Sequence, residues 1–379
     1  MGVVDEAKPV KKTTIRVREF DVERDPRAVE ELERLCQVGL SGDQGSDHPV
    51  ADHDRGAEKT TRSSKKKKKK GMSLYVEQIG DPFARVRHAP DNIILVAEYG
   101  EEDEVVGVIK ACTRMVSRGK KKQSLGSSSK QFVKVACLLG LRVSPSHRRL
   151  GVATELVRRA EAWCAARGAA YATMATTESN AASLALFTGR FAYAPFRRPA
   201  FLGRPVHRHR RGGPEEPARA PSFAMLSVWD ATRSLRLRVG GAPALLRASL
   251  AAARALDRHV PWLQVPSVPD IFRPFGTYLL YGLRMSGPEG PALLRSLCQH
   301  AHNVARKNPA CAVLAADLGP GDPAKAVVPH WPKFSCDEDV WCIKKLGASA
   351  ASDNAGNDDD DDWTTSPPPS VLFVDPREF

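Results

Sequence analysis

The stretch LRVSPSHRRLGVATELV (residues 141–157) runs from an apolar strand through a Ser-Pro-Ser turn to two arginines and a glycine, then to a helical pattern. A helix N-terminus presents unpaired backbone N–H groups and carries partial positive charge, and together these bind phosphate. Gly151 and Ala153 are small enough to let a diphosphate approach the backbone, and Arg148 and Arg149 add full charges. The stretch therefore predicts a phosphate site. A plain turn with solvated arginines is the alternative, because neither common glycine-rich phosphate loop pattern is present.

The surrounding sequence predicts alternating strands and helices. Apolar periodicity and turn residues indicate strands at 15–20, 92–100, 104–113, 132–143, 169–176 and 191–196. Helical spacing indicates helices at 26–37, 151–167 and 180–187. We predict an α/β (α+β) fold in which strand 132–143 is central, because that strand is apolar along most of its length.

Two motifs carry a resemblance to a known family. The spacing Arg148-x-x-Gly151-x-Ala153 after a central strand resembles the acetyl-CoA pyrophosphate loop of GCN5-related (GNAT) N-acetyltransferases, and NAASLALFTGRFAY (180–193) resembles their closing segment. The likeness covers about residues 13–200 and implies a mixed central sheet flanked by helices. LFTGRFAYAPFRRPAFLGRPVHRH, SCDEDVWCIKKLG and the final VDPREF also resemble plant HOOKLESS-type probable N-acetyltransferases. That resemblance implies a plant protein with tandem lobes and a role in differential growth.

The chain divides into four parts on composition. We expect a disordered N-terminus (1–12), a GNAT domain (13–202) with a disordered insert (about 41–71), a Gly/Pro/Arg-rich linker (203–221) and a second lobe (222–379). Residues 279–301 echo 138–160, and each is followed by an Ala-rich strand, so the second lobe is expected to be a degenerate GNAT-like repeat. Chance similarity is the alternative. The resembling family has a longer segment after His209, so this lobe is expected to be incomplete.

The resemblance implies direct transfer of acetyl from acetyl-CoA, without a metal, to an amine on a protein or small molecule. Pantetheine is expected beside the end of strand 132–143, and pyrophosphate on the N–H groups of residues 149–153. Asn180 is expected near the pantetheine arm, although N-capping of a short helix would equally explain it. The expected cofactor-binding residues are Leu141, Arg142, Val143, Arg148, Arg149, Leu150, Gly151, Val152, Ala153, Asn180 and Phe187.

Acid and base candidates are few. Many members of the resembled family have a tyrosine acid where this chain has Phe187, so Tyr193 is the replacement candidate, with a core tyrosine as the alternative. Strand 132–143 has no carboxylate, so the base candidates are Glu178, then Glu98 and His147, unless a water relays the proton. We predict Glu178 and Tyr193 as catalytic residues.

The second lobe is predicted not to bind CoA, because GPEGPALL (287–294) lacks the arginines and Glu289 would repel a phosphate. Cys336 and Cys342 match no metal-ligand spacing, so SCDEDVWCIKKL (335–346) is interpreted as a loop entering a buried strand. The eight cysteines contain no C-x-x-C pair and indicate a reducing compartment rather than disulfides.

The net charge of +13 favours anionic partners. Lys65–Lys70 could act as a nuclear-import signal or contact acidic partners, or be a solvated run; no base-specific nucleic-acid motif accompanies it. No apolar run is long enough to span a membrane, so we expect an intracellular protein, in the nucleus rather than the cytoplasm. Two other functions remain open: a non-catalytic acetyl-CoA-binding scaffold, and a basic nuclear interaction protein on a vestigial GNAT fold.

Overall fold

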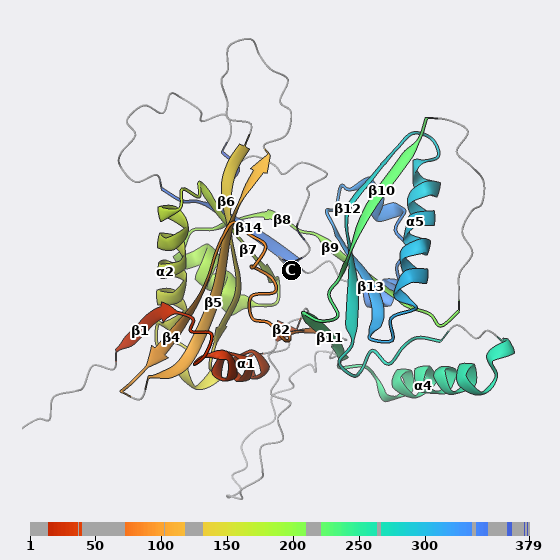
Figure 1. The fold of residues 1–379 in the computed structure, drawn as a ribbon, viewed down its shortest axis with the longest axis horizontal. Helices are drawn as coiled ribbons and strands as arrows, with labels where there is room; N and C mark the ends of the chain where they lie inside the picture. The colour runs from red at the N-terminus through yellow and green to blue at the C-terminus, as the bar shows by residue number, and fades with distance from the viewer. Residues whose placement is uncertain are drawn as a thin grey trace, which may run out of the picture.

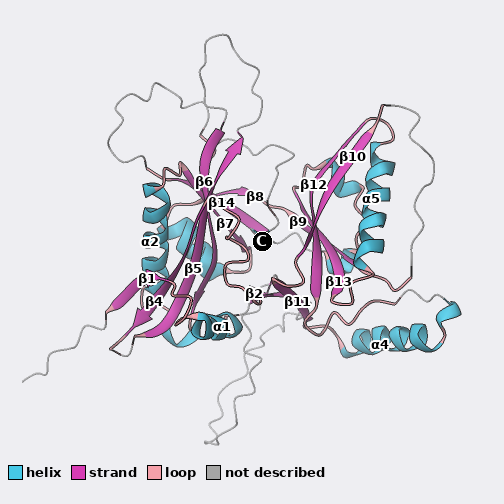
Figure 2. Cartoon of the chain, in the orientation of Figure 1, coloured by secondary structure: helices cyan, strands magenta, loops and turns pink. Residues whose placement is uncertain are grey.

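The computed structural model describes residues 14–36, 38–39, 73–101, 103–117, 132–209, 221–263, 267–335, 339–347, 362–365, 375 and 377. Two lobes lie side by side, each a β-sheet with helices packed on it (Figures 1 and 2). The predictions for residues 1–12, for the insert at 41–71 and for Lys65–Lys70 lie outside the described residues.

The first lobe is built on a seven-stranded sheet with the order β1-β4-β5-β6-β7-β14-β8. Apolar residues of α2 pack on one face of this sheet, and Val29 and Leu32 of α1 pack on the other. The strands are β1 (Ile15–Glu19), β4 (Asp91–Tyr99), β5 (Glu104–Ser117), β6 (Phe132–Val143), β7 (Tyr171–Thr177), β14 (Asp339–Lys345) and β8 (Ala194–Arg197); the helices are α1 (Pro26–Leu35), α2 (Val152–Ala166), the single turn α3 (Ala181–Leu184) and a π-helix (Ala185–Arg190). The predicted mixed sheet flanked by helices is confirmed.

The unit β6–α2–β7 forms the centre of this lobe. Strands β6 and β7 are parallel, and α2 connects them across the face that buries Leu156, Val157 and Ala160. Gly107 on β5 allows this helix to lie close, because a Cβ there would come within 2.8 Å of Val152 and 2.9 Å of Leu156. The start of α2 is therefore fixed against the sheet.

Strand β14 comes from the far end of the chain and lies between β7 and β8. Its pairs with β7 run from Asp339 opposite Thr177 to Lys345 opposite Tyr171, and Trp341, Cys342 and Ile343 are buried. The buried strand predicted for this stretch is confirmed, while Cys336 lies outside the described residues. Because β14 belongs to the first sheet, the structure differs from the expected domain division, which gave residues 222–379 to the second lobe.

The second lobe has a four-stranded sheet with the order β10-β12-β13-β9. Its β12–α5–β13 unit repeats the strand–helix–strand order of the first lobe with parallel strands, as the internal echo predicts. A third sheet, β11-β3-β2, combines strands from both halves of the chain. The remaining elements are β2 (Val38–Gly39), β3 (Ser73–Gln78), β9 (Ala200–Pro205), β10 (Phe223–Asp230), β11 (Leu235–Gly240), α4 (Ala244–His259), β12 (Gly276–Ser286), α5 (Gly290–Ala305), β13 (Cys311–Leu318) and four short 3₁₀ turns at 145–147, 261–263, 323–326 and 332–334.

The connection between the lobes also differs from the prediction. Residues 203–205, expected to begin a linker, are the end of β9, which pairs with β13. Val206 is buried, and the backbone N–H of His207 donates to Nε2 of His302 at 2.9 Å. The linker was predicted from the Gly, Pro and Arg content of this stretch, and that composition hid the apolar run AFLGRPV, which forms the strand. The two lobes meet through a buried ion pair, with Arg197 Nη1 of β8 3.1 Å from Asp317 Oδ2 of β13.

Two further observations concern the described residues alone. None of their helices combines the length and apolar character needed to cross a bilayer. They also contain no group of three or more His, Cys, Asp or Glu side chains placed to hold a metal ion.

Candidate active site

Strands β6 and β7 separate partway along their length. Their pairing runs from Val135 opposite Tyr171 to Leu138 opposite Met174 and stops there. Beyond that point β6 follows β5 as far as Val143, whereas β7 follows β14. The backbone of β6 at residues 139–143 therefore has no strand on the β7 side among the described residues, as expected of a cleft that receives an extended chain such as pantetheine.

A bulge sits in β6 at this opening. Gly140 has φ +65°, and the register with β5 shifts between the pairs Lys110–Leu139 and Val108–Arg142. A positive φ is costly for residues with a Cβ, so glycine is suited to this turn of the strand. The bulge redirects the last residues of β6 away from β7, because an extra residue bends the strand that carries it.

The loop before α2 exposes its backbone. Arg149 has φ +64° and Gly151, the N-cap residue of α2, has φ +95°. Arg148, Arg149, Leu150 and Gly151 are exposed, and no side chain caps the helix. The first N–H groups of a helix have no partner within it, so they point from this end towards any bound anion. Val152 is buried beneath the loop and Ala153 is half-buried.

The other expected cofactor-binding residues lie around this opening. Leu141 and Val143 pack against the core beneath α2, whereas Arg142 turns to the α1 side, with Nε 3.7 Å from Oε2 of Glu33. Asn180 caps α3, since its Oδ1 accepts from the backbone N–H of Ser183 at 3.1 Å. The capping role of Asn180 is confirmed, and contact with a pantetheine arm stays a prediction.

Phe187 and Tyr193 are both core residues, each about 2% exposed, with ring centroids 5.2 Å apart at 87°. The Tyr193 hydroxyl is buried without a hydrogen-bond partner. Burial, together with the nearby Glu161 carboxylate, raises the pKa of Tyr193 well above its ordinary value. This setting favours packing over proton donation, so the predicted acid role of Tyr193 gains no geometric support.

The three carboxylate and imidazole candidates for the base differ in their surroundings. Glu178 follows the end of β7, is half-exposed and forms an ion pair with Arg198. Glu98 is 1% exposed and is contacted by Arg16 and Arg18 at 2.6–2.8 Å. Burial would raise the pKa of Glu98, but hydrogen bonds from the two arginines outweigh it and lower the pKa. His147 packs edge-on against Tyr99 with ring centroids 5.0 Å apart. Glu178 is the most accessible of the three.

A buried ion cluster lies on the α1 side of the bulge. Lys110 Nζ is 3.0 Å from Glu33 Oε1 and 2.6 Å from Gln78 Oε1, and Lys110 is 1% exposed. Burial would raise the pKa of Glu33, but the charges of Lys110 and Arg142 outweigh it and lower the pKa. Sequence reasoning missed this cluster because its residues come from separate segments. The only signal was a lysine within the apolar run EVVGVIKACT.

The second lobe keeps the bulge and lacks the open loop. Gly282 has φ +62°, and the β10–β12 register shifts beside it, as at Gly140. At the start of α5, however, Ser222 Oγ accepts from the backbone N–H of Glu289 at 3.2 Å. A Cβ on Gly287 would lie 2.4 Å from the same oxygen, so the chain before β10 fills this end of the helix.

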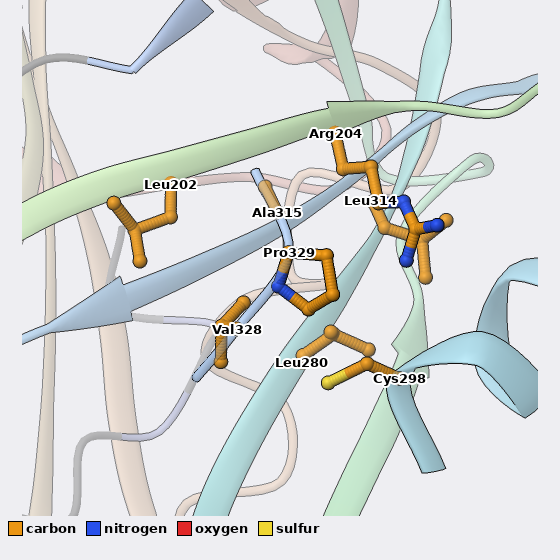
Figure 3. A pocket seen from close by; sticks show the side chains of 8 residues that line it. All are labelled: Leu202, Arg204, Leu280, Cys298, Leu314, Ala315, Val328 and Pro329. Atoms are coloured by element: carbon orange, nitrogen blue, oxygen red, sulfur yellow. The ribbon is translucent and has the colours of Figure 1, made fainter. Parts of the chain in front are cut away.

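A small cavity of the second lobe lies elsewhere, between the sheet and α5 (Figure 3). Its walls are apolar apart from Arg204, whose Nη2 is 3.1 Å from Oε1 of Gln299. It therefore offers no acid–base pair. The lining residues are Leu202, Arg204, Leu280, Cys298, Leu314, Ala315, Val328 and Pro329.

Comparisons with known proteins match this chain to acetyltransferases. Residues 64–193 match a family model described as "Acetyltransferase (GNAT) family". The "Acetyl transferase GW6a" of Oryza sativa subsp. japonica is 62% identical, over 97% of this chain and 98% of that protein. The "Probable N-acetyltransferase HLS1" of Arabidopsis thaliana is 35% identical, over 96% of this chain and 99% of that protein. The alignment with the rice protein spans 424 residues, more than the 379 of this chain, so that relative contains segments absent here.

Among solved structures, Eis1 from Mycobacterium abscessus matches 88% of this chain and 74% of its own, at 15% identity and a TM-score of 0.36. A GCN5-related N-acetyltransferase from Kribbella flavida matches 67% of this chain and 59% of its own, at 15% identity and a TM-score of 0.33.

Proposed function

Because this chain belongs to the GNAT acetyltransferase family, we propose that it moves an acetyl group from acetyl-CoA directly to a primary amine. The observation that carries the proposal is the opening between β6 and β7 next to an exposed helix N-terminus. The open backbone at residues 139–143 suits an extended amide-containing arm. The positive φ angles at Arg149 and Gly151 suit a diphosphate at close range.

Each part of the site has a distinct task in this proposal. The loop residues 148–153 hold the diphosphate through backbone N–H groups and the charges of Arg148 and Arg149. Leu141, Arg142 and Val143 supply the strand edge, and a backbone N–H at the bulge polarises the carbonyl that is attacked. Phe187 contributes apolar packing beneath the opening, where it is buried.

Glu178, at the open end of β7, is the base that we propose takes the proton from the incoming ammonium. The Tyr193 hydroxyl is too deeply buried to favour the acid role, so the thiolate would leave with a proton from water.

We further propose that the acceptor is a protein amine, a lysine or an N-terminus, and that the protein acts in the nucleus of a plant cell in growth regulation. The plant relatives and the resemblance of the sequence to HOOKLESS-type proteins support this setting. The six lysines at 65–70 support nuclear import.

One observation favours a second candidate, a scaffold that binds acetyl-CoA without turnover. Phe187 stands where many family members have a tyrosine acid, and phenylalanine cannot donate a proton. Such a scaffold would bind acetyl-CoA and release no CoA in the presence of amines.

Isothermal titration of acetyl-CoA into the full chain tests the proposal. We expect micromolar binding by the wild type and loss of binding in Arg148→Ala/Gly151→Asp. The matched control is Arg158→Ala/Gly168→Asp, which changes an exposed arginine of α2 and a positive-φ glycine at its other end. No binding by folded wild-type protein, or equal loss in the control, would contradict the proposed site. CoA release upon addition of lysine peptides then separates the enzyme from the scaffold.

A further inference from the structure

Strand β10 lies at the edge of the second-lobe sheet. Within the described residues it pairs with β12 on one side and with no strand on the other. Phe223 is 56% exposed, Met225 53% and Val228 40%. An open edge with large apolar side chains is a template for pairing with another strand.

The first lobe shows what normally covers such an edge. Strand β5 occupies the position of β10, since it lies antiparallel to the bulged strand β6 with a matching register shift. On its other side β5 pairs with β4 in antiparallel fashion, and α1 packs its Val29 and Leu32 beside the two strands. By analogy, the side of β10 that no described strand occupies suits an antiparallel strand.

The sequence between Arg208 and Ser222 is poorly suited to supply that strand. Arg208 lies at the C-terminal end of α5, where its carbonyl accepts from Arg306, and Ser222 lies at the N-terminal end, beside Glu289. Helix α5 has 16 residues, which at 1.5 Å each is about 24 Å. Arg208 and Ser222 are 14 residues apart in sequence, a reach of at most about 50 Å, and crossing the length of α5 needs about half of it, which leaves residues 210–220 little surplus for a further strand. Their sequence, RRGGPEEPARA, also contains two prolines, which a paired strand disfavours.

We propose that the edge of β10 pairs with β10 of a second copy of this chain, antiparallel and about a two-fold axis. The strand FAMLSVWD contains one charged residue, Asp230 at its end, and no proline. It lacks the lysine or proline that blunts edge strands, and an apolar strand whose single charge lies at its end is complementary to itself. Pairing would join the two four-stranded sheets into one and bring the exposed apolar side chains of one β10 beside those of the other.

Sedimentation or light scattering of the full chain at about 1–100 µM tests this association. We expect a particle of twice the 41.3 kDa chain mass at the upper concentrations. Met225→Lys and Phe223→Lys should shift it to one chain mass, because each places a charge at the contact. The matched control is Phe132→Lys, which changes an equally exposed phenylalanine on β6 of the first lobe.

A wild-type monomer throughout this range would overturn the proposal, as would a dimer that survives Met225→Lys. Loss of the dimer in Phe132→Lys would place the contact in the first lobe instead. Thermal unfolding of each variant confirms that the substitutions act on association rather than on folding.

The pairing register can be tested separately by cysteine cross-linking of Phe223→Cys, Met225→Cys and Ser227→Cys, which share one face of β10. A two-fold antiparallel pair brings one position opposite itself, and a disulfide needs Cβ atoms about 4 Å apart. Rapid oxidation of one variant with little in the other two is expected. Equal slow oxidation of these three and of Ala224→Cys and Leu226→Cys on the other face would contradict an ordered β10 pair.

Discussion

The units β6–α2–β7 and β12–α5–β13 share their backbone and differ in what surrounds it. Both have a positive-φ glycine in the first strand, and both place an arginine two residues later. Arg142 Nη1 donates to the carbonyl of Leu141 at 3.1 Å, and Arg284 Nη1 donates to that of Leu283 at 2.9 Å. Yet the loop before α2 is exposed, and that before α5 is filled by Ser222. The bulge is therefore common to both units, whereas the exposed loop is found only in the unit that we propose binds acetyl-CoA.

The faces opposite the helices also differ. In the first lobe that face contains the buried ions of Glu33 and Lys110, whereas in the second lobe it is an apolar cluster around Leu279, Val313 and Phe334. Buried ions cost free energy to desolvate, so a folding role alone would favour the apolar arrangement. The two lobes therefore fill this face with different chemistry, buried ions in the first and apolar side chains in the second.

The largest expected effect comes from breaking that cluster. Lys110→Met should lower the free energy of unfolding by about 3–5 kcal/mol, because it leaves the Glu33 carboxylate buried with a weaker partner. The double variant Glu33→Gln/Lys110→Met should recover part of this loss. Urea denaturation measures both. The single variant Glu33→Gln is measured as well. If the double variant lost as much unfolding free energy as the two single variants lose in total, the two residues would not act as a pair.

Substitution of the two bulge glycines compares the lobes directly. Gly140→Ala and Gly282→Ala should each cost about 1–2 kcal/mol of unfolding free energy, because alanine disfavours a positive φ. Only Gly140→Ala should weaken acetyl-CoA binding in a titration. Equal weakening by Gly282→Ala would show that the second lobe contributes to the cofactor site.

The ion pair between the lobes predicts a pH effect. Burial raises the pKa of Asp317 to about 6. The charge of Arg197 lowers this pKa, but by less than burial raises it. The folded protein therefore holds this proton at pH values where the unfolded chain, with its ordinary aspartate, has lost it. The resulting stability is largest at low pH and is lost as the pH rises through about 6, by about 1 kcal/mol between pH 5 and pH 7.

The check is the difference in unfolding free energy between wild type and Asp317→Asn, measured across that range. The variant has no such proton to lose, so the difference should change with pH in the stated direction. A constant difference would show that Asp317 titrates as an ordinary surface carboxylate.

The smallest effects are expected at the caps that follow the second strand of each unit. Asn180 accepts from Ser183 N, and Asp322 accepts from Ala324 N at 2.9 Å. Asn180→Gly and Asp322→Gly should each cost a few tenths of a kcal/mol, because glycine is itself a tolerated cap. If Asn180 also contacts pantetheine, only Asn180→Gly will weaken acetyl-CoA binding; an unchanged affinity would limit its role to capping.

Local patterns were sufficient to predict most of the first lobe. The stretch 132–157 has strand, turn and helix signals in sequence order, and its glycine and arginines lie where the structure exposes them. The echo at 279–301 likewise predicted a second parallel unit. Both predictions depend only on residues within about thirty positions of each other, the range over which hydrophobic periodicity and turn residues are informative.

Features that depend on distant pairing could not be predicted in this way. Nothing near Trp341 indicates that β14 lies beside β7, and nothing near Lys110 indicates that Glu33 and Gln78 will meet it. The strand at Ala200–Pro205 was concealed because its Gly and Pro residues resemble a linker, although β13 supplies its partner. The general base could not be chosen among Glu178, Glu98 and His147 for the same reason, because the exposure of each side chain depends on the folded lobe.

The position of β14 has a consequence for how the protein is made. The sheet that contains the proposed cofactor site needs a strand synthesised after the whole second lobe, since Thr177 pairs with Asp339. During translation, the edge of β7 that pairs with β14 has no partner until more than a hundred further residues have been synthesised. The second lobe, whose own strands come in one continuous stretch from β9 to β13, can fold first. The acetyltransferase lobe is thus begun early in translation and completed near its end, and a nascent chain gains the finished sheet only once the second lobe has been made.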